Sequence, residues 1–206
     1  MSSERIVNFS AGPAAIPLEV LEEVQENLTN YKGAGLSVME MSHRSKEYDE
    51  IHENAIQYVK ELYSIPDNYS VMFLQGGASH QFAMAPMNLA SDGKVVQVVN
   101  TGSWTKKAIG ELKKGFNYDV VATSEEANFL ELPNVTSDLF SDDAAYAYMC
   151  SNNTIFGTQF KTFPTDIKIP LVVDMSSDIL SRELTISDFG LIFAGAQKNI
   201  GPSGVT

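Results

Sequence analysis

Two ionisable side chains at the ends of strand-like runs are the residues of this chain best suited to chemistry. Lys198 follows the apolar run 189–194, and Asp174 ends the run 170–174. An apolar strand that ends in an ionisable group usually points that group into a site at the carboxyl edge of a sheet. An amine can form a Schiff base with an aldehyde, and a carboxylate can hold a pyridine nitrogen protonated. The pair therefore suggests pyridoxal phosphate chemistry.

Both residues also have an ordinary structural interpretation. Asp174 precedes Ser176 and Ser177, so it is suited to capping a turn or helix at this point. Lys198 is suited to a solvated surface position, where most lysines lie. These two residues alone leave the alternatives open, and the rest of the chain has to decide between them.

The elements around these residues predict an α/β fold, with a mostly parallel sheet flanked by helices. Apolar residues repeat at helical spacing over 17–31 and from about 46 to 62. Beyond residue 70 strand-like and helix-like segments alternate, which is typical of βαβ units. The expected strands are 70–74, 94–99, 118–122, 144–149 and the two runs that end at Asp174 and near Ala194, and the expected helices between them are 79–90 and 105–113.

A glycine turn at 75–79 joins the first of these strands to a helix. Its glycines allow a tight turn, and the free amides at the helix start make an anion site to which Ser79 can add a hydroxyl. The spacing is neither that of a Walker A loop nor that of a dinucleotide fingerprint. An ordinary strand-to-helix turn is an equal alternative, but pyridoxal phosphate does carry a phosphate.

Three further segments offer groups suited to a ring or an anion. Trp104, the only tryptophan, follows an expected strand and provides a flat face for stacking, although a lone aromatic usually lies in a core. The segment 151–154 offers hydroxyl and amide groups for a ring oxygen, or is a hydrophilic turn. In the segment 42–44, Arg44 is suited to binding a carboxylate or phosphate. The alternative is a solvated side chain just before a helix.

Composition excludes several classes of protein. The chain has 206 residues and a formal net charge of -12, which argues against a nucleic-acid partner. Cys150 is the only cysteine, so an intrachain disulfide is impossible, and it is interpreted as a small buried hydrophobe. We predict no secretory signal, no membrane span and no metal site. A cytoplasmic location is the expectation.

Six segments, in order from residue 8 to residue 202, resemble those of the phosphoserine aminotransferase family. They are 8–13 (NFSAGP), 41–45 (MSHRS), 73–79 (FLQGGAS), 101–104 (TGSW), 151–154 (SNNT) and 194–202 (AGAQKNIGP). The resemblance implies the large domain of a fold-type I pyridoxal phosphate enzyme of the class V aminotransferase group. Any one segment is modest evidence, but the ordered set is highly specific.

The resemblance also implies a role for each matched residue. Lys198 carries the cofactor and shuttles the proton, and Asp174 pairs with the pyridine nitrogen. The remaining cofactor contacts are Trp104 on the ring, Thr154 near the ring hydroxyl, and Ala78, Ser79 and Gln197 at the phosphate. The implied substrate-binding residues are Arg44, His43 and Ser10, with Arg44 serving the neighbouring subunit of a homodimer whose active sites are shared. Some relatives have arginine where this chain has Ser79, and His80 is a candidate replacement for that charge.

Family members are longer, so we expect this chain to be the first part of a longer protein. The expected organisation is an N-terminal arm over 1–15 and an incomplete cofactor-binding domain over 16–206, without the small C-terminal domain. The implied activity is amino transfer between O-phospho-L-serine with 2-oxoglutarate and 3-phosphooxypyruvate with L-glutamate. An alanine–glyoxylate aminotransferase and a non-catalytic phosphate-binding α/β domain are the alternatives.

Overall fold

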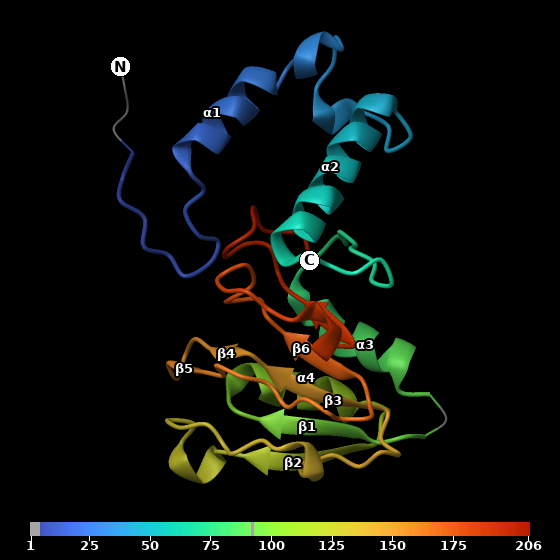
Figure 1. Ribbon diagram of the computed structural model, residues 1–206. Coiled ribbons are helices and arrows are strands. Elements are labelled where there is room, and N and C mark those ends of the chain that lie inside the picture. The colour runs from blue at the N-terminus through green and yellow to red at the C-terminus, as the bar shows by residue number, and fades with distance from the viewer. Residues whose placement is uncertain (1–4, 92) are drawn as a thin grey trace. The chain divides into compact units, whose positions relative to one another are not determined.

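The computed structural model describes residues 5–91 and 93–206, and the chain divides into two compact units (Figure 1). The first unit runs up to Phe73 and the second from Leu74 to Thr206. The boundary that the sequence suggests between an arm over 1–15 and a domain over 16–206 stays a prediction.

The first unit is helical. Its elements are α1 (Leu18–Asn27), the short 3-10 helices η1 (Tyr31–Gly33) and η2 (Val38–Glu40), and α2 (Lys46–Tyr63). Both helices expected from the apolar spacing are present, although α1 ends before residue 31. The start of α2 is set by Ser45, whose Oγ accepts a hydrogen bond from the amide of Tyr48 at 3.3 Å.

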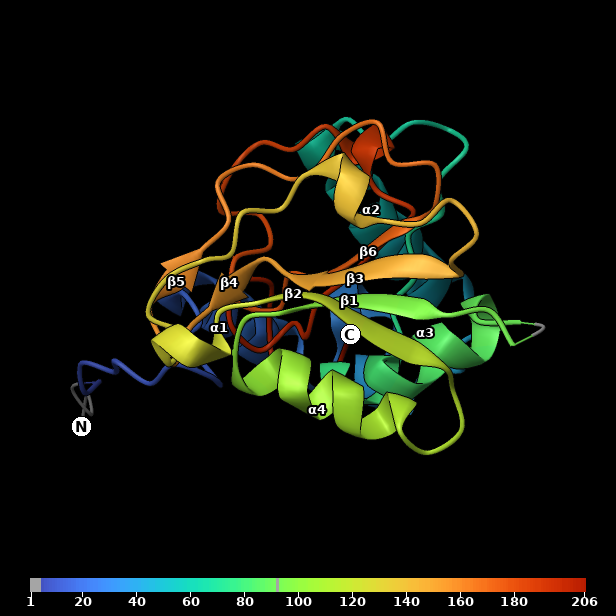
Figure 2. The same cartoon turned by 90° about the horizontal axis from the view of Figure 1, so that it is seen from below.

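A parallel sheet forms the centre of the second unit, as Figure 2 shows. Its strands lie in the order β2 (Tyr118–Thr123), β1 (Val96–Asn100), β3 (Tyr146–Cys150), β6 (Leu171–Asp174) and β7 (Leu191–Phe193), and every neighbouring pair is parallel. The middle strands β1, β3 and β6 are buried along their whole length. Strands buried on both faces read as continuous apolar runs, which is why the sequence indicated them.

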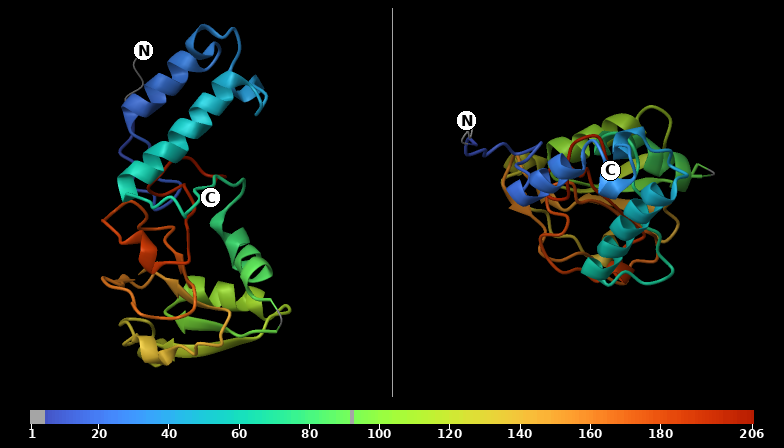
Figure 3. Two further views of the ribbon diagram at one scale, coloured as in Figure 1. Left: turned by 45° about the vertical axis from the view of Figure 1, so that its right-hand side comes forward. Right: turned by 90° about the horizontal axis from the view of Figure 1, so that it is seen from above.

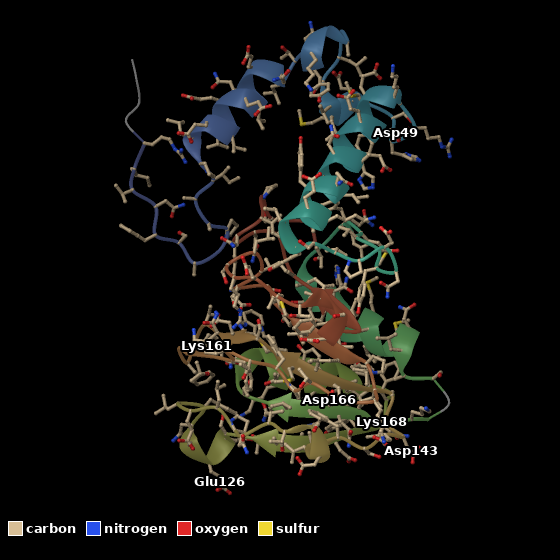
Figure 4. All side chains as sticks on the ribbon, in the orientation of Figure 1. Asp49, Glu126, Asp143, Lys161, Asp166 and Lys168 are labelled. Carbon is tan, nitrogen blue, oxygen red and sulfur yellow. The ribbon has the colours of Figure 1, made fainter. Side chains whose placement is uncertain are left out.

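Helices cover one face of this sheet. The 3-10 helix η3 (Ala78–His80) leads into α3 (Gln81–Leu89), and α4 (Ser103–Leu112) lies beside α3 (Figure 3). Phe82 of α3, Leu112 of α4 and Tyr148 of β3 belong to one buried cluster. The other connections between strands are irregular. They contain the short 3-10 helices η4 (Glu125–Ala127), η5 (Ser137–Leu139) and η6 (Ile186–Asp188). Charged side chains of these connections, such as Glu126 and Asp166, are exposed (Figure 4).

The structure differs from the expectation at two places. The apolar run 70–74 forms no regular strand; only a single antiparallel bridge joins Gln75 to Val205. A strand needs a continuous ladder of partners, and here the pairing is confined to 74–76 against 204–206. The expectation missed a small antiparallel hairpin, β4 (Asn152–Asn153) with β5 (Thr158–Gln159), because its polar sequence resembles a simple turn.

Strand register places the chemically interesting residues next to one another. Cys150 on β3 pairs with Asp174 on β6, and Asp174 pairs with Phe193 on β7. The segment that carries Lys198 follows β7 directly. Because the strands are parallel, their carboxyl ends meet at one edge of the sheet, which is where sites form in such folds.

Candidate functional site

A pocket lies at the carboxyl edge of the sheet, and all of its lining residues belong to the second unit. Residues from the glycine turn, from α4 and from the ends of β3, β6 and β7 contribute to it. Among the sequence-derived candidates, those that line the pocket are Ala78, Ser79, Trp104, Asp174, Gln197 and Lys198. The fold thus brings together six residues that are up to 120 positions apart in the chain.

Asp174 ends β6 and presents its carboxylate to the pocket while being only 4% exposed. Its Oδ1 accepts two hydrogen bonds, from the amide of Ser176 at 2.9 Å and from the Ser176 hydroxyl at 2.6 Å. Among the described residues no donor reaches Oδ2, which leaves that oxygen for a donor entering from the pocket. Burial raises the pKa of Asp174, and the Ser176 hydrogen bonds and the charge of Lys198 act against that rise.

The two sequence interpretations of Asp174 turn out to be compatible. The bond from the Ser176 amide to Oδ1 caps the turn over 175–180, as expected of an aspartate before two serines. The same carboxylate lines the pocket. One oxygen therefore shapes the backbone, and the other remains available for a ligand.

Lys198 is half-buried and lines the same pocket. Its turn is held by hydrogen bonds from the amide of Ala196 to the carbonyl of Val205 at 2.9 Å and from the Asn199 side chain to the carbonyl of Ile179 at 2.6 Å. The Lys198 Nζ lies 5.9 Å from the centroid of the Trp104 ring. A primary amine and a flat aromatic face are thus close together in one pocket.

The glycine turn forms another wall of the pocket. Gly76 has φ of +102°, and a Cβ at this position would come within 2.5 Å of the His80 ring, so only glycine fits here. The backbone then leads into η3, whose first amides have no partner inside the helix. Among the described residues that line the pocket, Lys198 is the sole Lys, Arg or His. An anion at this wall would depend on amides and hydroxyls.

Four sequence-derived candidates do not line the pocket. Thr154 is exposed in the turn between β4 and β5. Ser10, His43 and Arg44 are exposed residues of the first unit, where the amide of Arg44 donates to the Ser42 hydroxyl at 3.2 Å. Their roles stay predictions.

Several lining residues were not anticipated as site residues. Ser176 and Ser177 lie in the pocket wall. Asn152, from the segment 151–154 that the sequence had suggested for a ring oxygen, also lines the pocket, and its amide donates to the Ser177 hydroxyl at 2.9 Å. Cys150 is buried, as interpreted from the sequence, but it also lines the pocket. Burial and the neighbouring Asp174 raise the pKa of this thiol well above its usual value. Strand register was the signal that could have revealed Cys150, because it pairs with Asp174.

A second buried carboxylate supports the site from outside the pocket. Asp178 accepts hydrogen bonds from the Ser151 hydroxyl and, at 3.1 Å, from the Gln159 amide, and it forms an ion pair with Arg182 at 3.3 Å. The Ser151 hydroxyl also lies 3.1 Å from the backbone carbonyl of Asp174. This network therefore ties the β4–β5 hairpin to the end of the strand that carries Asp174.

Neither metal coordination nor membrane insertion is indicated by the described residues. No group of three or more His, Cys, Asp or Glu side chains among them could hold a metal ion. Within the same residues, no helix combines the length and apolar character needed to cross a membrane.

Comparison with known proteins gives a consistent result. Residues 6–206 match the family Aminotransferase class-V. The chain is 50% identical over 203 residues to the phosphoserine aminotransferase of Halalkalibacterium halodurans and 53% identical over 203 residues to that of Geobacillus kaustophilus. Each alignment covers 98% of this chain and 56% of the relative, so the chain spans about half the length of these curated relatives.

Solved structures agree with the sequence relatives. The phosphoserine aminotransferase of Bacillus circulans subsp. alkalophilus superposes with a TM-score of 0.93 at 50% identity, over 98% of this chain and 56% of that one. The enzyme of Trichomonas vaginalis, solved with PLP bound, superposes with a TM-score of 0.89 at 43% identity, over 98% and 56%. The predicted α/β fold, with a mostly parallel sheet flanked by helices, is confirmed, and the chain belongs to the class-V aminotransferase family.

Proposed function

We propose that this chain, as a member of the class-V aminotransferase family, forms the cofactor-binding part of a phosphoserine aminotransferase. The proposed reaction is reversible amino transfer between O-phospho-L-serine with 2-oxoglutarate and 3-phosphooxypyruvate with L-glutamate, a step in L-serine biosynthesis. A related phosphorylated substrate, 4-phosphohydroxy-L-threonine of pyridoxine biosynthesis, is included in the proposal. The observation that carries it is the convergence of Asp174, Lys198 and Trp104 on one pocket.

The pocket's donors and acceptors fit pyridoxal 5'-phosphate. The second oxygen of Asp174 is free of donors from the described residues and suits a protonated pyridine nitrogen. Trp104 offers a flat face for the ring, and the amides of η3 with the Ser79 hydroxyl suit a phosphate. When bound, this cofactor supplies an electron sink for charge that develops at the substrate's α-carbon.

Each residue then has a defined task. Lys198 would hold the cofactor through its amine and, when released, would move the proton from the substrate's α-carbon to the C4′ carbon of the cofactor. Asp174 keeps the pyridine nitrogen protonated by placing a negative charge beside it. Ala78, Ser79 and Gln197 bind the phosphate, and Thr154 binds near the ring hydroxyl.

Recognition of the substrate's second anionic group is assigned to Arg44, with His43 and Ser10 in support. Arginine binds carboxylates and phosphates bidentately, and both phosphoserine and glutamate carry such a group. We place this recognition in a homodimer with shared active sites, in which these residues serve the neighbouring subunit. The enzyme is proposed to act in the cytoplasm on small amino and oxo acids.

The nearest alternative is another class-V aminotransferase, such as an alanine–glyoxylate aminotransferase. Arg44 and His43 favour a doubly anionic substrate and therefore disfavour that alternative. A non-catalytic phosphate-binding domain would leave the Lys198 amine without a task, although it is held in the pocket with Asp174.

Borohydride labelling separates these functions. The full-length protein should be yellow as purified, and borohydride should fix the cofactor's mass on a peptide that contains Lys198. The Lys198→Ala variant should lose both the label and transamination while keeping the circular dichroism of the parent. A colourless protein that gains no mass on Lys198 in the presence of added pyridoxal phosphate would overturn the proposed function.

A further inference from the structure

Ser176 connects the two chemical groups of the pocket. It lies two residues beyond Asp174, and its hydroxyl donates a hydrogen bond to Asp174 Oδ1 at 2.6 Å. The same hydroxyl oxygen accepts a hydrogen bond from the backbone amide of Gly195 at 3.0 Å. Gly195 lies three residues before Lys198. A continuous hydrogen-bond chain thus runs from the lysine-bearing segment through Ser176 to the carboxylate of Asp174.

The direction of these bonds is fixed by chemistry. A backbone amide can only donate, so the Gly195 amide occupies an acceptor site of the Ser176 hydroxyl. An ionised carboxylate can only accept, so the hydroxyl proton is directed at Asp174. Ser176 therefore donates to Asp174 in its charged form, and the segment before Lys198 holds the hydroxyl in the donating orientation.

The surroundings of Asp174 make this donor important. The carboxylate is 4% exposed, and it interacts electrostatically with the Cys150 thiol and the Tyr148 hydroxyl on β3 and with the second carboxylate, Asp178. Lys198 is the cation whose charge favours its ionised form. Most neighbours of Asp174 thus fail to stabilise a negative charge, and the two hydrogen bonds from Ser176 do so directly.

The neighbouring serine provides a natural comparison. Ser177 also lines the pocket, but its hydroxyl donates to the carbonyl of Asn152 at 3.2 Å and accepts from the Asn152 side chain. No hydrogen bond between Ser177 and Asp174 is found among the described residues. The two adjacent serines have similar chemistry and a similar place, but only Ser176 touches the carboxylate.

We propose that Ser176 is a positioning residue that keeps Asp174 ionised, aims its Oδ2 into the pocket and couples it to the segment that carries Lys198. The catalytic consequence rests on the proposed function, in which Asp174 partners the cofactor's pyridine nitrogen. The structural part, an Asp174 ionisation controlled by Ser176, does not depend on any bound cofactor.

The first experiment measures that ionisation in the full-length protein freed of cofactor. Aspartate labelled with carbon-13 at Cγ is titrated by NMR, and the Asp174 signal is identified by its loss in Asp174→Asn. Ser176→Ala removes a hydrogen bond to the charged form, so the pKa of Asp174 should rise above that of the parent. Ser176→Thr keeps a hydroxyl and should restore the parent titration. Ser177→Ala should leave the Asp174 titration unchanged.

The second experiment measures turnover in the holoenzyme. Ser176→Ala should lower kcat about 10- to 100-fold, the factor that corresponds to the loss of one charge-assisted hydrogen bond. KM for glutamate should change by no more than about twofold, because Ser176 touches Asp174 rather than the substrate. Ser176→Cys, which preserves side-chain volume but donates weakly, should resemble Ser176→Ala.

The outcomes separate the two proposals. An Asp174 titration that is the same in Ser176→Ala and in the parent, or that shifts equally in Ser177→Ala, would overturn the positioning role whatever the enzyme does. If the titration shifts as expected but the parent protein takes up no cofactor on Lys198, the positioning role stands and the proposed function fails.

Discussion

Replacing Arg182 by methionine should destabilise the fold substantially, because it leaves a buried carboxylate without its counter-ion. The Asp178 side chain is 4% exposed and that of Arg182 is 22% exposed, so water can solvate Asp178 only after the structure opens. The guanidinium also donates to the carbonyl of Phe160 at 2.6 Å, and that bond is lost too. Removing one partner of a buried pair costs about 3–5 kcal/mol. The partial exposure of Arg182 places the expected loss near the lower end, at roughly 3 kcal/mol.

The assay is urea unfolding of the full-length protein followed by circular dichroism, with the slope compared between variants to check that the same transition is observed. Lys168→Met is the matched control. Lys168, labelled in Figure 4, forms an ion pair with Asp142, but the two side chains are 74% and 58% exposed. An exposed pair contributes about 0–1 kcal/mol, so this variant should unfold almost like the parent.

A double variant tests the cause of the loss. Asp178→Asn combined with Arg182→Met removes both charges, so its destabilisation should be smaller than the sum of the two single losses. An Arg182→Met variant that unfolds within about 1 kcal/mol of the parent, as the loss of an exposed pair would give, contradicts a stabilising role for this buried pair. Single losses that simply add in the double variant contradict it equally.

Three further predictions concern the pocket and its substrates. Asp174→Asn should leave cofactor bound but slow single-turnover proton abstraction by orders of magnitude, and an unchanged rate would reduce Asp174 to a turn cap. Arg44→Ala should lower kcat/KM for phosphoserine and glutamate far more than for alanine, since a charge-assisted hydrogen bond to the second anionic group contributes about 1.5–3 kcal/mol. An equal loss for all three substrates would contradict a role of Arg44 in binding that group. The Cys150 thiol has a raised pKa because it is buried, so at neutral pH iodoacetamide should modify it much more slowly in the folded protein than in urea; equal rates would contradict its burial.

The parts of the fold that the sequence predicts well are those with continuous apolar runs. The middle strands of the sheet are buried on both faces, so runs such as 94–99 and 144–149 were recognisable, and helices α2 and α4 began within two residues of the expected start. The run 70–74 is also mostly apolar but forms no regular strand, because strand formation depends on a partner that composition does not reveal.

The candidate site was predictable only for residues whose position at the end of a strand indicates a place at the edge of the sheet. Asp174 and Lys198 follow apolar strands, and this position alone indicated a shared edge. Ser176 gave no such signal, because its importance depends on the Gly195 amide, which a different strand brings to it. Asp178 lies in a polar stretch that resembles a surface turn, and only the folded chain shows that the Ser151 hydroxyl bonds to it.

The pairing of 74–76 with 204–206 has a consequence for biosynthesis. The Leu74 amide donates to the carbonyl of Thr206 at 2.7 Å, and the Thr206 hydroxyl donates to the carbonyl of Gly76 across 130 positions of sequence. At a translation rate of 5–20 residues per second, the ribosome needs about 7–26 s to make that intervening stretch. During this interval the nascent glycine turn lacks its backbone partners, so the wall of the pocket nearest η3 is completed only after the strands that carry Cys150 and Asp174 have been made.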